Sequence, residues 1–100
     1  MIINLLFNAQ RALGEAGGRI TLTTRRADAD TVEILVRDDG PGIGQNDLAQ
    51  LFTPFFSRTG GTGLGLALAA QTVKAHGGTI EAANNPGRGA CFTVRLPIPK

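Results

Sequence analysis

Glycine is the residue type that most constrains how this chain can fold. The 100 residues include 14 glycines, about twice the share found in an average protein. They fall in five clusters, at positions 14/17/18, 40/42/44, 60/61/63/65, 77/78 and 87/89. The clusters separate apolar segments instead of lying among serines, as they would in a flexible linker. We therefore interpret each cluster as a place where the backbone turns sharply or approaches another group closely.

The segments between the glycine clusters carry the periodicity of regular secondary structure. Apolar residues at helical spacing predict helices over the ranges 2–13, 47–52 and 64–75. Alternating residues predict strands over the ranges 19–26, 32–37, 79–83 and 91–96. The strand over 19–26 is expected to be half-buried, with Ile20 and Leu22 on its inner face. This order of elements predicts an α+β fold, a two-layer sandwich of mostly antiparallel sheet with helices packed on one face.

Composition excludes several classes of partner and site. The net charge is only +2, from 10 basic against 8 acidic residues, so neither nucleic acid nor a membrane surface is an expected partner. Cys91 is the only cysteine and His76 the only histidine, which excludes an internal disulfide and any metal site built from several such residues. No apolar run approaches the roughly 20 residues that span a bilayer. We therefore expect no direct membrane insertion.

The length fits one small domain, which we expect to occupy residues 1–100. The sequence opens inside the apolar pattern of its first helix, at MIINLL, without the charged leader or cleavage site of a signal peptide. A natural domain seldom begins within a helix. We therefore expect a fragment that lacks the N-terminal side of its fold.

The first predicted helix carries a polar stripe. Its members follow one another at spacings of four, three and four, and so share one face of the helix: Asn4, Asn8, Arg11 and Glu15. One interpretation is a solvated face. The other is a binding site, in which two amide oxygens face a hard cation and the arginine meets an anion.

The segment DDGPGI at residues 38–43 leaves the second strand and turns sharply. It is either a surface loop with solvated carboxylates or a ligand site. In the second case Asp38, at the end of the strand, accepts a hydrogen bond from an exocyclic amino group. Such a carboxylate favours adenine over guanine, whose carbonyl at the same place only accepts hydrogen bonds.

The glycines from Gly60 to Gly65 lead into the helix predicted over 64–75. They serve either tight packing of a helix start or the approach of a phosphate to free backbone N–H groups. Their spacing differs from the dinucleotide-binding fingerprint, and the Lys-Ser/Thr pair of a P-loop is absent. Upstream, Phe52, Phe55 and Phe56 form either a small core under a loop or a latch that anchors a mobile lid.

Taken together, five segments resemble, in the same order, the motifs of the ATP-binding catalytic domain of sensor histidine kinases, within the GHKL ATPase superfamily. Residues 4–9 (NLLFNA) resemble its N box and residues 38–43 its first glycine box. Residues 51–56 (LFTPFF) resemble its F box and residues 61–67 (GTGLGLA) its second glycine box. Residues 87–93 (GRGACFT) resemble a third, weaker glycine box.

The resemblance implies ATP and Mg²⁺ as ligands and assigns residues to them. The implied nucleotide-binding residues are Asn4, Asn8, Arg11, Asp38, Gly40, Gly42, Ile43, Arg58, Gly61, Thr62, Gly63, Leu64, Gly65 and Thr93. Asn8 would hold Mg²⁺, and Asp38 would bind the adenine amino group, with Gly42 and Thr93 nearby through water. The backbone of residues 61–65 would cradle the phosphates, Arg11 and Arg58 would neutralise them, and residues 44–62 would form the lid.

Asn4 is the candidate catalytic position. The hydrolytic branches of the superfamily carry at this helix position a glutamate that activates water. An amide cannot take up a proton at neutral pH, so Asn4 favours transfer of the phosphoryl group to a protein histidine over hydrolysis.

The implied partners are the histidine-containing dimerisation domain of a parent kinase and a downstream response regulator. The chain would be cytoplasmic, whether or not the parent is anchored in a membrane, and it would bind nucleotide without phosphorylating itself. The family's domain usually begins with a further strand. Its absence would expose a sheet edge and invite abnormal homo-oligomers. The alternative function is a GHKL-type nucleotide-dependent binding module, similar to an anti-sigma factor, that acts through partner binding.

Overall fold

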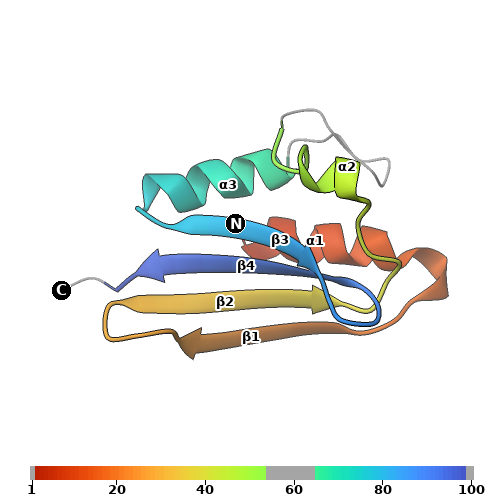
Figure 1. The fold of residues 1–100 in the computed structure, drawn as a ribbon, viewed down its shortest axis with the longest axis horizontal. Coiled ribbons are helices and arrows are strands. Elements are labelled where there is room, and N and C mark those ends of the chain that lie inside the picture. Colours follow the sequence, from red (N-terminus) through yellow and green to blue (C-terminus); the bar gives the residue numbers. More distant parts are fainter. Residues whose placement is uncertain (1, 54–64, 99–100) are drawn as a thin grey trace.

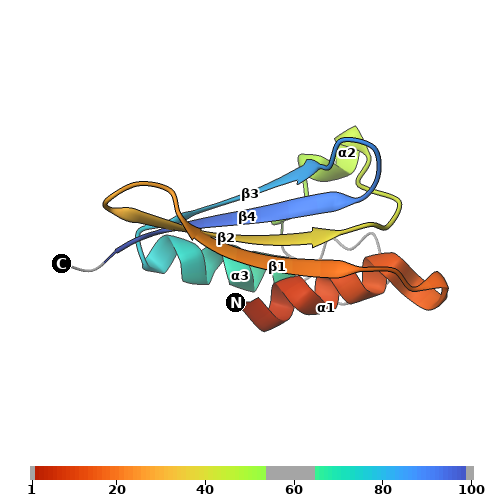
Figure 2. The same ribbon diagram turned by 90° about the horizontal axis from the view of Figure 1, so that it is seen from below.

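The computed structural model describes residues 2–53 and 65–98, which form a helical layer on one antiparallel sheet (Figures 1 and 2). The helices are α1 (Ile2–Leu13), the 3-10 turn η1 (Gly14–Ala16), α2 (Gln45–Leu48) and α3 (Gly65–Ala75). The strands are β1 (Ile20–Arg26), β2 (Thr31–Asp38), β3 (Thr79–Asn84) and β4 (Ala90–Pro97), in the spatial order β1-β2-β4-β3. The predicted α+β sandwich is confirmed.

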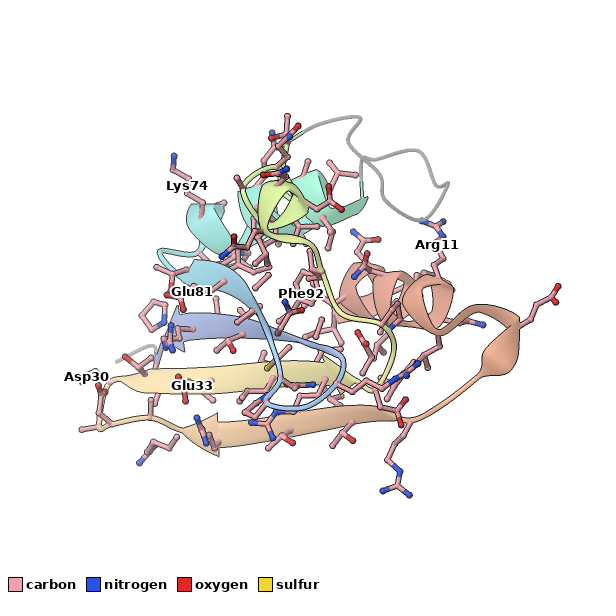
Figure 3. The ribbon with its side chains drawn as sticks, turned by 45° about the vertical axis from the view of Figure 1, so that its right-hand side comes forward. Arg11, Asp30, Glu33, Lys74, Glu81 and Phe92 are labelled. Atoms are coloured by element: carbon pink, nitrogen blue, oxygen red, sulfur yellow. The ribbon has the colours of Figure 1, made fainter. Side chains whose placement is uncertain are left out.

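The core lies between the sheet and the helices α1 and α3, which pack against each other on the same face (Figure 2). Phe92 of β4 is fully buried there, between the sheet and the helices (Figure 3). Val36 and Val94 from the sheet, and Leu5 and Val73 from the helices, complete its centre. Burial of each such side chain contributes about 1.5–3 kcal/mol, so packing of the helices against the sheet stabilises the fold.

The opposite face of the sheet carries a ladder of ion pairs that crosses all four strands. Glu33 of β2 accepts hydrogen bonds at 2.7 Å from Nε of Arg25 on β1 and at 2.7 Å from Nε of Arg95 on β4. Arg95 also pairs with Glu81 of β3 at 3.1 Å. The Glu33 side chain is only 8% exposed. The hydrogen bond from Arg25, and then that from Arg95, holds the pKa of Glu33 below its ordinary value.

Two predictions of secondary structure are wrong in detail. The short helix expected over 47–52 lies at Gln45–Leu48, and turns follow it up to residue 53. The strand β1 is not half-buried: only Ile20 is partly covered, and Leu22 is 48% exposed. The reason is that β1 is an outer strand and α1 contacts it only weakly, because α1 packs mainly over β2 and against α3.

Candidate functional site

Asp38, the last residue of β2, has a buried carboxylate that is only half satisfied. The residue is 3% exposed. Its Oδ1 accepts hydrogen bonds from the backbone N–H of Gly40 at 3.0 Å and of Ala90 at 3.3 Å. Its Oδ2 is buried and has no hydrogen-bond partner within the part of the chain that the structure describes. Because an unpaired buried acceptor is costly, this oxygen indicates a place for a donor supplied by a ligand.

The loop that follows Asp38 is held from the β3–β4 hairpin. Gly42 adopts a φ of +85°, and the next residue, Ile43, is buried. The side-chain amide of Asn84 donates to the carbonyl of Ile43 at 2.8 Å and accepts from its N–H at 2.7 Å. Asn85 donates to the carbonyl of Asp38 at 3.1 Å. The hairpin therefore holds both ends of the loop that carries the carboxylate.

The polar stripe of α1 lies on the same side of the sheet as the Asp38 carboxylate. Asn4 and Asn8 are partly buried, and Nδ2 of Asn8 is buried without a hydrogen-bond partner among the described residues. A Cβ added to Gly65, the first residue of α3, would lie 3.9 Å from Cγ of Asn4. Arg11 is exposed in the last turn of α1 and projects away from the sheet (Figure 3). The Asn4 amide therefore lies beside the start of α3, and the Asn8 amide follows it one turn later on α1.

These groups suit a magnesium-bound adenine nucleotide. The free Oδ2 of Asp38 can accept from an exocyclic amino group. Rotation of the Asn8 amide by half a turn brings its oxygen to the place of the unpartnered nitrogen, where a hard cation can bind it. The N-terminal end of α3 beside Asn4 carries the positive end of the helix dipole, which favours phosphate. Among residues 2–53 and 65–98, no group of three or more acidic, histidine or cysteine side chains could hold a metal. A Mg²⁺ ion held by Asn8 would take its other ligands from phosphate and water oxygens.

Most of the expected residues that the structure describes fall in two groups. Asp38, Gly40, Gly42 and Ile43 lie at the end of β2 and in the loop after it, and Asn4 and Asn8 lie on α1, with Asn4 beside Gly65. Phe52 packs edge-on against Phe92, with ring centroids 6.3 Å apart, which supports a small core under the loop. Several expected residues lie outside the described residues: Phe55, Phe56, Arg58, Gly61, Thr62, Gly63, Leu64 and the lid from residue 54 to 62.

Thr93 is not brought to Asp38. Phe92 and Val94 face the helices, and successive side chains of a strand point to opposite faces. Thr93 therefore lies on the other face of the sheet, where its Oγ1 is 3.7 Å from the Sγ of Cys91. The β4 residue that meets Asp38 is Ala90, through its backbone N–H.

Sequence reasoning missed Asn84 and Asn85, the two residues that hold the loop. In the sequence they precede Pro86 and Gly87 and so indicate a turn. The signal that could have found them is the predicted hairpin itself, because it places its loop at the same end of the sheet as the end of β2. Their partners lie as far as 47 residues away in the sequence, and periodicity carries no information at that distance.

Within the described ranges, no helix is long and apolar enough to cross a membrane.

A family model and curated relatives match nearly the whole of this chain. The family described as histidine kinase-, DNA gyrase B-, and HSP90-like ATPase matches residues 1–100. The sensor histidine kinase ZraS of Klebsiella oxytoca is 43% identical over 99 residues, which make up 98% of this chain and 21% of ZraS. The chain thus spans about a fifth of the length of this curated relative.

Solved structures share the fold. The mycobacterial sensor histidine kinase MprB matches with a TM-score of 0.87 and 32% identity, over 96% of this chain and 66% of that chain. The histidine kinase ThkA, in a complex with the response regulator protein TrrA, matches with a TM-score of 0.77 and 32% identity, over 96% of this chain and 27% of that chain. On the sequence match and the shared fold, this chain belongs to the histidine kinase-, DNA gyrase B- and HSP90-like ATPase family.

Proposed function

We propose that this chain is the ATP-binding catalytic domain of a sensor histidine kinase in two-component signal transduction. It binds Mg-ATP and presents the γ-phosphoryl group to a histidine on a separate dimerisation domain. The observation that carries the proposal is Oδ2 of Asp38, which is buried without a hydrogen-bond partner among the described residues, on the same side of the sheet as the similarly unpartnered Nδ2 of Asn8. The carboxylate oxygen suits the adenine end of the nucleotide, and the Asn8 amide, turned so that its oxygen takes the place of the nitrogen, suits the metal at the phosphate end.

Each residue of the site then has one task. Asp38 accepts the adenine amino group, while Gly40, Gly42 and Ile43 form the wall of the adenine pocket. Asn8 binds Mg²⁺, which when bound neutralises charge on the phosphates. Phosphate oxygens accept hydrogen bonds from the backbone N–H groups of Gly61, Thr62, Gly63, Leu64 and Gly65. Arg11 and Arg58 offset the charge of the phosphates. Residues 44–62 close over the nucleotide as a lid.

Asn4 is the proposed catalytic residue of this set. It lies one turn before Asn8 on α1 and beside Gly65, and its amide can donate to or accept from a phosphate oxygen or an ordered water. It cannot remove a proton from water. The site therefore orients the phosphoryl group without activating water against it, which suits transfer to a histidine.

The proposed partners follow from this reaction. The phosphoryl group passes to a histidine-containing dimerisation domain of the same parent kinase and from there to a response regulator. The solved complex of ThkA with the response regulator TrrA supports the second partner. Both steps belong in the cytoplasm, where ATP is available.

Calorimetric titration of the full chain with a non-hydrolysable ATP analogue tests the adenine assignment. Asp38→Asn should weaken binding about 10- to 150-fold, because a hydrogen bond to a charged group contributes about 1.5–3 kcal/mol. Asp39→Asn is the matched control. Asp39 is exposed, and its Oδ1 accepts from the N–H of Arg19 at 2.8 Å, a bond that an asparagine oxygen can also make. Equal affinities of the two variants would refute the assignment.

Phosphoryl transfer is tested separately, by mixing the chain with the purified dimerisation domain of its parent kinase and ATP. Label on the acceptor histidine supports the kinase function. ATP-dependent capture of a partner without transfer of label would support the alternative, a nucleotide-dependent binding module.

A further inference from the structure

The amide of Asn84 makes an unusually complete connection to the loop after β2. Its Oδ1 accepts from the N–H of Ile43 at 2.7 Å, and its Nδ2 donates to the C=O of the same residue at 2.8 Å. One side chain thus satisfies both backbone groups of Ile43, as a neighbouring strand would. The connection joins residues that are 41 positions apart in the sequence.

The Asn84 amide also packs closely against the turn at Gly42, one residue before Ile43. Gly42 has a φ of +85°, and a Cβ added to it would lie 2.8 Å from the Oδ1 of Asn84. The turn at Gly42 therefore leaves just enough room for the amide. Because Ile43 is 5% exposed and belongs to the core, the far end of the loop is held both by packing and by the amide.

The near end of the loop is held by the next residue of the same hairpin. Nδ2 of Asn85 lies 3.1 Å from the carbonyl oxygen of Asp38 and 3.2 Å from that of Ala90. The N–H of Ala90 donates to the Oδ1 of Asp38. With both ends of the loop held, the carboxylate has one orientation, in which Oδ2 alone is left for a ligand.

We infer that Asn84 is a positioning residue that sets the purine selectivity of this site, because it holds the loop of residues 38–43 in the one conformation that presents the Asp38 carboxylate to an adenine amino group. This inference rests on the proposed function. Asn84 acts through Ile43 and the loop, and it does not touch the nucleotide.

The expected effect follows from the population of the binding-competent loop. Without the two hydrogen bonds the loop adopts other conformations, and the apparent dissociation constant rises by the inverse of the competent fraction. ATP depends on the fixed carboxylate, whereas GTP, whose base offers a carbonyl in place of the amino group, does not. Loss of Asn84 should therefore weaken ATP more than GTP. A merely destabilised fold would weaken both equally, because unfolding removes the site for either nucleotide.

The experiment measures the affinities of the full chain for non-hydrolysable analogues of ATP and GTP, with Mg²⁺, by calorimetry. Asn84→Ala should weaken ATP binding about tenfold and lower the ratio of ATP to GTP affinity about fivefold, as expected for the loss of two hydrogen bonds. Asn84→Asp is nearly isosteric. It keeps the acceptor for the N–H of Ile43 but turns a second oxygen toward its carbonyl, so it should also lower the ratio. Gln71→Ala removes an exposed amide on α3 and should change neither affinity.

The outcomes separate the inference from the function on which it rests. A lower ratio in the Asn84 variants, with the fold retained by circular dichroism, supports the positioning role. An unchanged ratio, even with both affinities reduced, overturns it and leaves Asn84 a structural residue. If Asn84→Ala does not fold, Asn84→Asp decides between these results. A wild-type chain that binds both nucleotides equally would instead overturn the adenine assignment of the proposed function.

Discussion

A methyl group on Gly89 tests how closely the β3–β4 loop must approach Asp38. Gly89 is buried and has a φ of +89°, a region that other L-residues seldom adopt. A Cβ built on it overlaps the carbonyl oxygen of Asp38, and lies 2.7 Å from the carbonyl carbon of Asp38 and 2.8 Å from the Cα of Asp39. All three atoms belong to the backbone. No side-chain rotation relieves the overlap, so the ends of β2 and β4 must separate.

Gly87 provides a matched control, because its φ is also +89° and nothing lies within 4 Å of an added Cβ. Gly87→Ala therefore carries only the cost of a left-handed backbone, about 1–2 kcal/mol. Gly89→Ala carries that cost as well as about 1–3 kcal/mol for forcing packed groups apart. It also loses the hydrogen bond from the N–H of Ala90 to Asp38, worth about 1 kcal/mol. We expect Gly89→Ala to lower the free energy of unfolding by about 2–4 kcal/mol more than Gly87→Ala does.

Urea unfolding followed by circular dichroism measures this difference. With a slope of about 1.5 kcal/mol per molar urea, the midpoint of Gly89→Ala should lie about 2 M below that of Gly87→Ala. Below both midpoints, titration with an ATP analogue should show weaker binding for Gly89→Ala alone, because only this variant displaces Asp38. Equal midpoints would show that the two strand ends separate without cost, and would refute the close approach as a requirement of the fold.

Three further changes test other parts of the molecule. Hydrogen bonds from Arg25 and then from Arg95 hold the pKa of Glu33 below its ordinary value of 4.5. The ionised Glu33 therefore stabilises the fold at pH values above its unfolded-state pKa. This contribution is lost as the pH falls through its folded-state pKa. The urea midpoint of the wild type should exceed that of Glu33→Gln at pH 7, and the difference between the two midpoints should become smaller at acid pH. A difference that does not change with pH would contradict the ion-pair role. Asn8→Ala should abolish the gain in ATP affinity that Mg²⁺ provides, while some nucleotide binding remains; an unchanged gain in calorimetry would exclude Asn8 as the metal ligand. Leu22→Lys places a charge on the exposed outer strand β1. It should reduce any self-association measured by sedimentation at high concentration. Unchanged self-association would show that copies of the chain do not meet along β1.

Most of the elements could be predicted from the sequence, because local patterns determine them. The pair Gly77 and Gly78 shows how. Gly77, at a φ of +77°, lets the N–H of Gly78 reach the carbonyl of Val73 at 2.9 Å and so ends α3. A Cβ on Gly78 would overlap the carbonyl oxygen of Arg95 on the adjacent β4. Backbone geometry therefore requires glycine at both positions. The prediction that this pair ends the helix is confirmed.

What the sequence could not provide is the contact between segments that lie far apart. The polar stripe of α1 and the loop after β2 each leave two interpretations open, and the buried atoms of Asn8 and Asp38 that have no partner among the described residues favour a site. The motif resemblance alone implies that Thr93 lies near the adenine through water. The alternation of Phe92, Thr93 and Val94 already placed its side chain on the other face of the sheet. The two hydrogen bonds between Asn84 and Ile43 depend on the register of β3 with β4. No local pattern reveals this register.

Among the described residues, two carboxylates are buried, and they differ in how completely their oxygens are hydrogen-bonded. Glu33 and Asp38 both lie in β2 and are 6% and 3% exposed. Both oxygens of Glu33 are paired with arginines, as expected where a charge serves only the structure. Asp38 pairs one oxygen with two backbone N–H groups, and its other oxygen is buried without a partner in residues 2–53 and 65–98, at a cost of about 1–3 kcal/mol. Total stabilities of small domains are only about 5–15 kcal/mol, so this cost is a substantial share. The same strand satisfies one carboxylate completely, so the oxygen of the other that lacks a partner among the described residues supports the proposal that a ligand supplies its donor.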